Sequence, residues 1–146
     1  MRLTNYTDYS LRVLIYLTNK KPGELANITE IAEAYGISRN HLTKVIHELG
    51  KIGVIHTIRG RGGGIKLALP PEEINIGEVV RKTEDDFNLV ECFGEGPSHC
   101  VISPVCGLRH VLNRALLAYL EVLDNYTLAD IVTSPQDYRA LLGLDH

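Results

Sequence analysis

The segment 27–53 constrains the fold more than any other part of this chain of 146 residues. Asn27 can cap a helix, and Glu30 stands three residues later, where its carboxylate can reach back to the cap. This short helix is predicted to end at Gly36, because glycine tolerates the left-handed conformation of a tight turn. Ser38 can cap a second helix. A short helix, a glycine turn and a longer helix form the helix-turn-helix pattern.

A predicted β-hairpin follows. The second helix should end at Gly50 or Gly53, and residues 54–69, VIHTIRGRGGGIKLAL, contain two β-branched runs on either side of a glycine-rich tip. Pro70 and the next proline close the segment. A hairpin after a helix-turn-helix is the arrangement of a winged helix.

Four further helices are predicted. Residues 4–19 predict a first helix, and Asn75 can cap a short helix that frays at the acidic residues 84–86. Residues 107–127 carry the longest helical pattern, and a last short helix should begin at Ser134. The predicted fold is mainly α with a small β-hairpin wing, made of a winged helix-turn-helix domain, a cysteine-bearing loop and a long dimerisation helix.

The long helix has an unusually wide apolar face. Its apolar residues form two adjacent stripes: Leu108, Val111, Ala115, Tyr119, Val122 and Tyr126 in one, and Leu112, Leu116, Leu120 and Leu123 in the other. A small winged helix cannot cover both stripes. Burial against a second subunit, and therefore a homodimer, is expected.

Charge is distributed unevenly along the chain. The net charge is −3, but residues 1–66 carry ten Lys/Arg and five Asp/Glu, whereas residues 67–146 carry five and thirteen. A basic N-terminal half can face a polyanion while the acidic half faces away. This favours double-stranded DNA as the partner of the winged helix.

The start of the second helix of a helix-turn-helix reaches base edges in the major groove. Arg can bind guanine and Asn can bind adenine through two hydrogen bonds each. Arginines on a glycine-rich wing can approach phosphates or enter a minor groove. The candidate DNA-binding residues are Ser38, Arg39, Asn40, His41, Thr43 and Lys44 on the helix, Arg59 and Arg61 on the wing, and Arg2 and Arg12 near the N-terminus. A winged helix that binds only protein is the alternative.

All three cysteines, Cys92, Cys100 and Cys106, lie in one Gly/Pro-rich loop with the spacing Cys-x7-Cys-x5-Cys. Zinc sites and bacterial ferredoxins use Cys-x2-Cys pairs, so the spacing indicates neither. Three thiolates in one loop can still surround one centre, and their softness would select zinc, copper(I) or an iron–sulfur cluster. The alternatives are three buried apolar side chains or a thiol-based redox regulator, in which two cysteines form a reversible disulfide.

Three protein ligands leave a fourth position open. Several groups could fill it: His99, His110, Asp8, a carboxylate among Glu84, Asp85, Asp86, Glu91 and Glu95, or a small molecule. The residues by themselves do not select among them. A centre with one labile ligand suits a sensor, because oxidants and diatomic gases can attack there.

The motifs LTNYTDYSLRVL, IRGRGGG, NIGEVVRKTE and CVISPVCGL extend over nearly the whole chain. Together they resemble the family of winged-helix iron–sulfur repressors, and most of all its nitric-oxide-sensing branch. The resemblance implies a homodimeric repressor with a [4Fe–4S] cluster, which binds an operator with two-fold symmetric half-sites and controls genes for nitric oxide detoxification and nitrite metabolism. Nitric oxide would be the signal that relieves repression.

Carried onto this sequence, the resemblance implies that Cys92, Cys100 and Cys106 are cluster ligands and that Asp8 is the fourth, supplied by the other subunit. A second branch, the IscR-type [2Fe–2S] regulators of iron–sulfur homeostasis, has a histidine three residues after the third cysteine. Arg109 stands there in this chain, with His110 next to it. This difference disfavours the [2Fe–2S] regulator, which is kept as the alternative.

The predicted domain boundaries are residues 1–70 for the winged helix-turn-helix domain, 71–107 for the short helix and cluster-binding loop, and 108–146 for the dimerisation and C-terminal helices. The N-terminus does not resemble a signal peptide, and no apolar run approaches membrane-spanning length, so a cytoplasmic protein is expected. An enzymatic role is not expected. An electron carrier or thiol oxidoreductase is disfavoured, since the chain has no Cys-x2-Cys pair.

Overall fold

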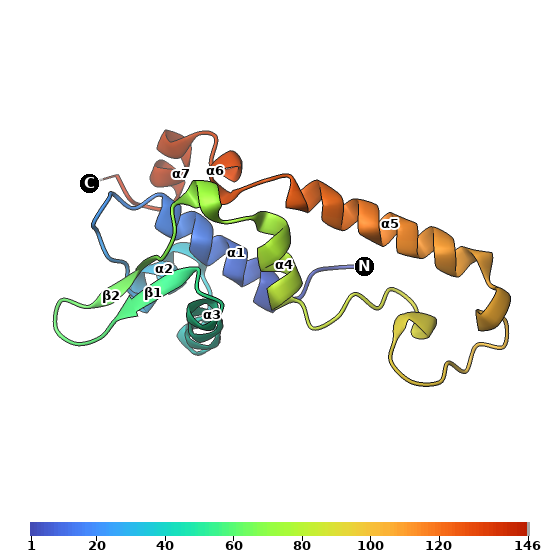
Figure 1. The fold of residues 1–146 in the computed structure, drawn as a ribbon. Coiled ribbons are helices and arrows are strands. Elements are labelled where there is room, and N and C mark those ends of the chain that lie inside the picture. Colours follow the sequence, from blue (N-terminus) through green and yellow to red (C-terminus); the bar gives the residue numbers. More distant parts are fainter. Residues whose placement is uncertain (146) are drawn as a thin grey trace.

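A computed structural model describes residues 1–145 and confirms the mainly helical architecture with one hairpin. Figure 1 shows a compact body from which helix α5 extends as an arm, with the cysteine loop around its far end. The elements are α1 (Asn5–Thr18), α2 (Ile28–Tyr35), α3 (Arg39–Lys51), β1 (Ile55–Ile58), β2 (Gly64–Leu67), α4 (Ile76–Thr83), α5 (Gly107–Asp124), α6 (Leu128–Ile131) and α7 (Pro135–Leu141), with short 3-10 turns at Pro71–Glu73, Glu91–Phe93 and Ser103–Val105.

Local hydrogen bonds set the boundaries of the helix-turn-helix. The Asn27 side chain accepts a hydrogen bond from the Glu30 amide at 2.8 Å, and the Glu30 carboxylate accepts one from the Asn27 amide at 2.7 Å. Gly36 has φ +66° at the turn. Ser38 accepts a hydrogen bond from the His41 amide at 3.1 Å and so caps α3. These are the caps and the turn that the sequence predicts.

The wing is a two-stranded antiparallel hairpin in which Ile55 faces Leu67 and Ile58 faces Gly64. Two backbone hydrogen bonds between Ala26 and Ile65, 2.7 and 2.9 Å long, connect the hairpin to the residue that precedes the Asn27 cap of α2. A Cβ atom at Gly64 would lie 2.7 Å from the Ala26 carbonyl oxygen, so this close approach requires glycine. The wing is thereby held against the helix-turn-helix.

The core of the body joins α1, α2, α3, the hairpin and α4, and it includes Leu120 of α5 and Leu128 of α6. The C-terminal half of α5 therefore belongs to the body. The sequence stripe Leu112, Leu116, Leu120 and Leu123 supplies this contact, and all but Leu112 pack against the core. Most of the other stripe is exposed, with Leu108 at 62% and Val111 at 60% of full exposure.

Helix α5 ends at Asp124, three residues before the predicted end, and a separate helix α6 follows that no sequence pattern predicted. Tertiary backbone pairing is the cause. The Tyr126 carbonyl accepts a hydrogen bond from the Ile76 amide at 2.9 Å, and the Leu128 amide donates one to the Ile74 carbonyl at 2.8 Å. The Thr127 hydroxyl then caps α6 by accepting a hydrogen bond from the Asp130 amide, and the Asp130 carboxylate accepts one from the Thr127 amide.

Gly77 marks the close approach of α4 to the end of α5. A Cβ atom at this position would lie 1.9 Å from the Asp124 carboxylate and 2.8 Å from its backbone nitrogen. Arg81 holds the same carboxylate through an Nη2–Oδ2 contact of 2.6 Å. Backbone atoms therefore limit the space at Gly77.

We expect Gly77→Ala to lower the free energy of unfolding by about 1–3 kcal/mol, because the added methyl group forces α4 and α5 apart. Chemical denaturation measures the change. Gly50→Ala is the matched control: Gly50 also lies in a helix, but nothing outside that helix lies within 4 Å of where its Cβ atom would be. Alanine there should stabilise by up to about 1 kcal/mol. Equal stability of the two variants would contradict the steric argument.

Candidate functional site

The predicted base-reading residues lie at the exposed N-terminal end of α3. Ser38, Arg39, Asn40 and Thr43 line a shallow hollow of about 410 Å³. Arg39 and Asn40 are exposed and no side-chain hydrogen bond within residues 1–145 occupies them. These two side chains can therefore form the paired hydrogen bonds that base edges require.

Three of the other α3 candidates have structural contacts, among them Thr43, whose hydroxyl donates to the Arg39 carbonyl at 2.8 Å. The Ser38 hydroxyl already accepts the capping hydrogen bond, and His41 is partly buried. The His41 ring lies edge-on to Tyr9 of α1, with ring centroids 4.7 Å apart. His41 thus joins α3 to α1 at the point where α3 would enter a groove. Lys44 is exposed one turn further on.

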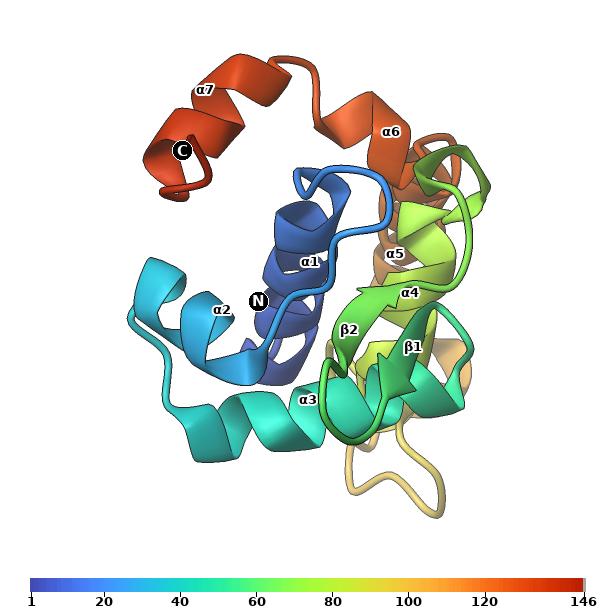
Figure 2. The ribbon, with the colours of Figure 1, turned by 90° about the vertical axis from the view of Figure 1, so that its left-hand side faces the viewer.

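The wing carries Arg59 and Arg61 at its exposed tip. Gly60 and Gly62 adopt positive φ angles of 90° and 76°, which allow the tight turn. Strand β1 contacts α3, and in both Figure 1 and Figure 2 the hairpin and α3 lie in the lower part of the body. The wing and α3 therefore belong to the same side of the body.

Asp8 and Arg12, one helical turn apart on α1, bind each other. Arg12 donates from Nε to Oδ1 at 3.1 Å and from Nη2 to Oδ2 at 2.9 Å. The guanidinium also lies 5.5 Å from the Tyr9 ring centroid and 5.8 Å from that of Tyr35. Burial raises the pKa of Tyr35 to about 12, and its hydroxyl donates to the Arg12 carbonyl at 2.8 Å. Arg12 is thus held on α1, whereas Arg2 is exposed near the N-terminus.

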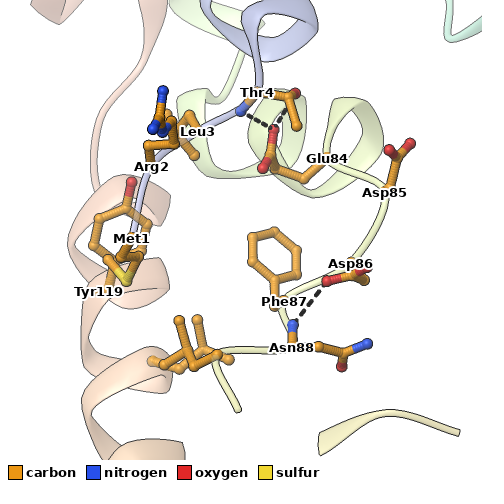
Figure 3. A pocket seen from close by; sticks show the side chains of 12 residues that line it. Met1, Arg2, Leu3, Thr4, Glu84, Asp85, Asp86, Phe87, Asn88 and Tyr119 are labelled. Atoms are coloured by element: carbon orange, nitrogen blue, oxygen red, sulfur yellow. Dashed lines mark hydrogen bonds between the residues drawn. The ribbon is translucent and has the colours of Figure 1, made fainter. Parts of the chain in front are cut away.

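Glu84, one of the candidate fourth ligands, is engaged in a different contact. Its Oε2 atom accepts hydrogen bonds from the Thr4 amide at 3.0 Å, from the Thr4 hydroxyl at 2.6 Å, and from the Thr7 hydroxyl. Figure 3 shows Glu84 turned toward Thr4. Glu84 therefore fastens the start of the cysteine-bearing segment to the N-terminus of α1. No sequence signal pointed to this contact, because 80 residues separate the two partners.

Burial acts to raise the pKa of Glu84, but the hydrogen bonds from Thr4 and Thr7 outweigh it, so this pKa lies below its usual value of 4.5. A carboxyl with a lowered pKa stabilises the fold fully at pH values above 4.5, and this stabilisation is lost as the pH falls through the folded-state pKa. The ionised carboxylate of Glu84 therefore contributes to stability at neutral pH.

We expect Glu84→Gln to lower the free energy of unfolding at pH 7 by about 1–2 kcal/mol, because an amide replaces a charged acceptor. The difference from the unsubstituted protein should shrink on acidification below pH 4.5. Urea denaturation across this pH range measures both effects. Glu72→Gln, at an exposed carboxyl, should leave stability at pH 7 unchanged. A difference that stays constant with pH would contradict the assignment.

The three cysteines are free thiols in the loop that leads into α5: Cys100 is exposed, and Cys92 and Cys106 are partly exposed. Within residues 1–145, no three His, Cys, Asp or Glu side chains gather closely enough to hold one metal ion. The donor set nevertheless fits an iron–sulfur group in chemistry, since three accessible thiols are unpaired and available. A single chain in this conformation does not bring Asp8 and the cysteines together as one ligand set.

The fold and the exposed α3 and wing residues define a winged-helix transcriptional regulator, and comparisons with known proteins agree. The sequence matches the Rrf2 family, described as "Iron-dependent Transcriptional regulator", over residues 3–134. The HTH-type transcriptional regulator NsrR of Bacillus subtilis is 68% identical over 144 residues, which cover 99% of each chain. This chain belongs to the Rrf2 family.

Solved structures support the same fold. The oxidised form of Staphylococcus aureus CymR has a TM-score of 0.73 and 28% identity, with coverage of 92% of this chain and 98% of that one. IscR of T. potens has a TM-score of 0.70 and 25% identity, with coverage of 90% and 86%. The family match and the NsrR relatives confirm the family that the sequence motifs indicated, and these relatives are named as transcriptional regulators, which is a non-enzymatic role. No helix within residues 1–145 is long and apolar enough to cross a membrane.

Proposed function

We propose that this regulator is a cytoplasmic homodimeric repressor that senses nitric oxide through a [4Fe–4S] cluster. Cys92, Cys100 and Cys106 would hold the cluster, with Asp8 of the second subunit as the fourth ligand. Its targets would be genes for nitric oxide detoxification and nitrite metabolism, controlled through an operator with two-fold symmetric half-sites. The proposal rests mainly on three accessible, unpaired thiols in one loop of a chain that closely resembles NsrR.

Each of three parts of the chain would perform one task of this function. Residues 1–70 would bind DNA, residues 71–107 would bind the cluster, and residues 108–146 would form the dimer. His146 lies outside the described residues. Support for the third part comes from the exposed stripe of α5, which includes Leu108 and Val111. Contiguous exposed apolar surface on a protein commonly marks a site that another protein covers.

When bound, the cluster would supply irons that nitric oxide can attack. Asp8 would be the ligand most easily displaced, because a hard carboxylate is an unusual ligand among soft thiolates. To serve as a ligand, Asp8 must leave or share its two hydrogen bonds with Arg12. The ion pair with Arg12 therefore competes with ligation, and it offers Asp8 a ready partner whenever the cluster is lost.

Helix α1 gives a route from Asp8 to the DNA-binding surface. Tyr9, the next residue, contacts His41 in the first turn of α3. A shift of α1 would therefore reach the residues proposed to read bases. Two recognition helices must match half-sites about 34 Å apart, so a small change in their separation weakens binding. Release of Asp8 would relieve repression in this way.

The deciding experiment is nitric oxide titration of anaerobically purified protein, in which the absorption spectrum and operator binding are followed together at constant salt. Both signals should change over the same range of nitric oxide. Asp8→Ala should weaken operator binding before any nitric oxide is added. If Asp8→Ala and cluster-free protein bind the operator as tightly as intact protein, the proposed mechanism is wrong. A [2Fe–2S] spectrum would instead support an iron–sulfur homeostasis regulator.

A further inference from the structure

Arg109 lies in the first turn of α5 without a partner of opposite charge. The helix begins at Gly107, so Arg109 occupies the third helical position, and its side chain is exposed. None of the ion pairs within residues 1–145 involves it. Figure 1 shows this end of α5 as the far end of the arm, where the cysteine loop joins the helix. The body therefore gives the Arg109 guanidinium no carboxylate to bind.

The helix itself makes this place unfavourable for a cation. The free amides of a first turn carry positive partial charge, so acidic side chains stabilise a helix N-terminus and basic ones destabilise it. The first turns of α1, α2 and α4 contain Asp8, Glu30 and Glu78, whereas that of α5 contains no acid. Its cap residue, Cys106, forms no side-chain hydrogen bond with the amides. The positive end of α5 and the Arg109 guanidinium therefore lie together, and no ion pair within the described residues balances them.

The residue at the cap of α5 is the third of the proposed cluster ligands. In a capping box, the side chain at the third helical position reaches back to the cap residue, so positions 106 and 109 are neighbours on the helix surface. A [4Fe–4S] core, even in its 2+ state, becomes a net anion when three thiolates and one carboxylate bind it. Such a group on Cys106 would supply negative charge where the helix end and Arg109 lack it.

We propose that Arg109 and the free first-turn amides of α5 retain the cluster electrostatically, beside Cys106, without binding iron. This role deepens the proposed function and rests on its cluster. An arginine side chain keeps its proton and offers no lone pair, so Arg109 contributes charge and hydrogen bonds but is not a ligand. Without the cluster, Arg109 and the helix dipole oppose each other. Arg109 therefore stabilises the cluster-loaded form and destabilises the cluster-free chain.

The rate of cluster loss tests the first half of this role. Full-length protein is purified anaerobically with its cluster, excess EDTA is added at fixed pH, and the decay of the visible absorption is followed. Arg109→Gln should lose the cluster about tenfold faster than the unsubstituted protein, as is typical when a group that supports a metal ligand is removed. Arg109→Glu should be faster still, and Arg109→Lys should stay near the original rate.

Two further observations show whether charge is the cause. Raising the salt to about 1 M should shrink the differences among the variants, because screening weakens interactions between exposed charges. Arg114→Gln is the matched control: it removes another exposed cation of α5 that forms no ion pair within the described residues, and it should lose the cluster at the original rate. Variants that lose the cluster during purification, while Arg109→Lys keeps it, would give the same answer.

The cluster-free chain tests the second half of the role. In urea denaturation of cluster-free protein, Arg109→Gln should be at least as stable as the unsubstituted chain, because a cation no longer opposes the helix dipole. An arginine that only supports packing, or that binds a carboxylate of a second subunit, would make Arg109→Gln less stable without the cluster as well. A loss of stability in the cluster-free variant would therefore overturn the proposed role.

The outcomes also separate this role from the proposed function. If the unsubstituted protein holds a cluster, and Arg109→Gln and Arg109→Glu lose theirs at the same rate, Arg109 does not retain the cluster and the proposed function stands. If the unsubstituted protein holds no cluster after anaerobic purification, both are wrong.

Discussion

Replacing Arg39 and Asn40 together by alanine should lower affinity for the operator about a hundredfold, while affinity for unrelated DNA falls much less. Each side chain is exposed at the start of α3 and can form two hydrogen bonds with a base, worth about 1–3 kcal/mol of discrimination. About 1.4 kcal/mol corresponds to a factor of ten, so two such losses give the expected change. Fluorescence anisotropy with a selected operator and with random DNA of equal length measures both affinities.

Two control variants distinguish the loss of base contacts from the loss of positive charge. Arg59→Ala with Arg61→Ala on the wing should weaken binding to both DNAs and reduce its dependence on salt, because phosphate contacts carry no sequence information. Lys51→Ala removes a cation from the opposite end of α3, where Lys51 pairs with Glu48 at 3.3 Å, and it should change little. If the Arg39–Asn40 variant keeps its preference for the operator, α3 does not read bases with these residues.

Replacing Cys106 by serine should abolish the visible absorption of anaerobically purified protein and the response of operator binding to nitric oxide. The hydroxyl is close to the thiol in size, so the loop can keep its path, but it keeps its proton near neutral pH and lacks the softness that iron–sulfur groups select. Iron content should fall from about four atoms per chain to near zero. Operator affinity should fall at least about tenfold, as for cluster-free protein, if the loop anchors α1 of the partner.

Ser103→Ala, in the same loop, is the matched control and should keep both iron and response. Equal iron content in the Cys106→Ser variant and the unsubstituted protein would remove this cysteine from the ligand set. A different result would support the thiol-based redox regulator: the unsubstituted protein contains no iron, its operator binding responds to an oxidant, and Cys106→Ser abolishes that response. Parallel substitutions at Cys92 and Cys100 should reproduce the effect, because each supplies one ligand.

Some features of the fold could be predicted because their causes are local. The capping box of Asn27 and Glu30, the turn at Gly36 and the cap at Ser38 each act within a few residues, and each appears in the structure as expected. The early end of α5 could not be predicted in this way. It depends on hydrogen bonds from residues 74–76, about fifty positions away, which no periodicity in α5 encodes.

The same distinction between local and long-range causes applies to the candidate site. Sequence alone singled out the exposed Arg39 and Asn40, since their place at a helix start follows from the local pattern. It could not tell that Glu84 binds Thr4 instead of remaining free, or that His41 packs on Tyr9. Such contacts join segments far apart in the chain, so they exist only once the segments are packed together.

Sequence by itself determined the winged helix, the Rrf2 family and the placement of all three cysteines in one loop, because caps, periodicity and motifs are properties of neighbouring residues. Only the tertiary structure decided which stripe of α5 is covered. Both stripes are apolar, but the body covers Leu120 and leaves Val111 in water. Burial depends on where distant parts of the chain come to lie, and that physical fact identifies the exposed stripe as the surface available to a second subunit.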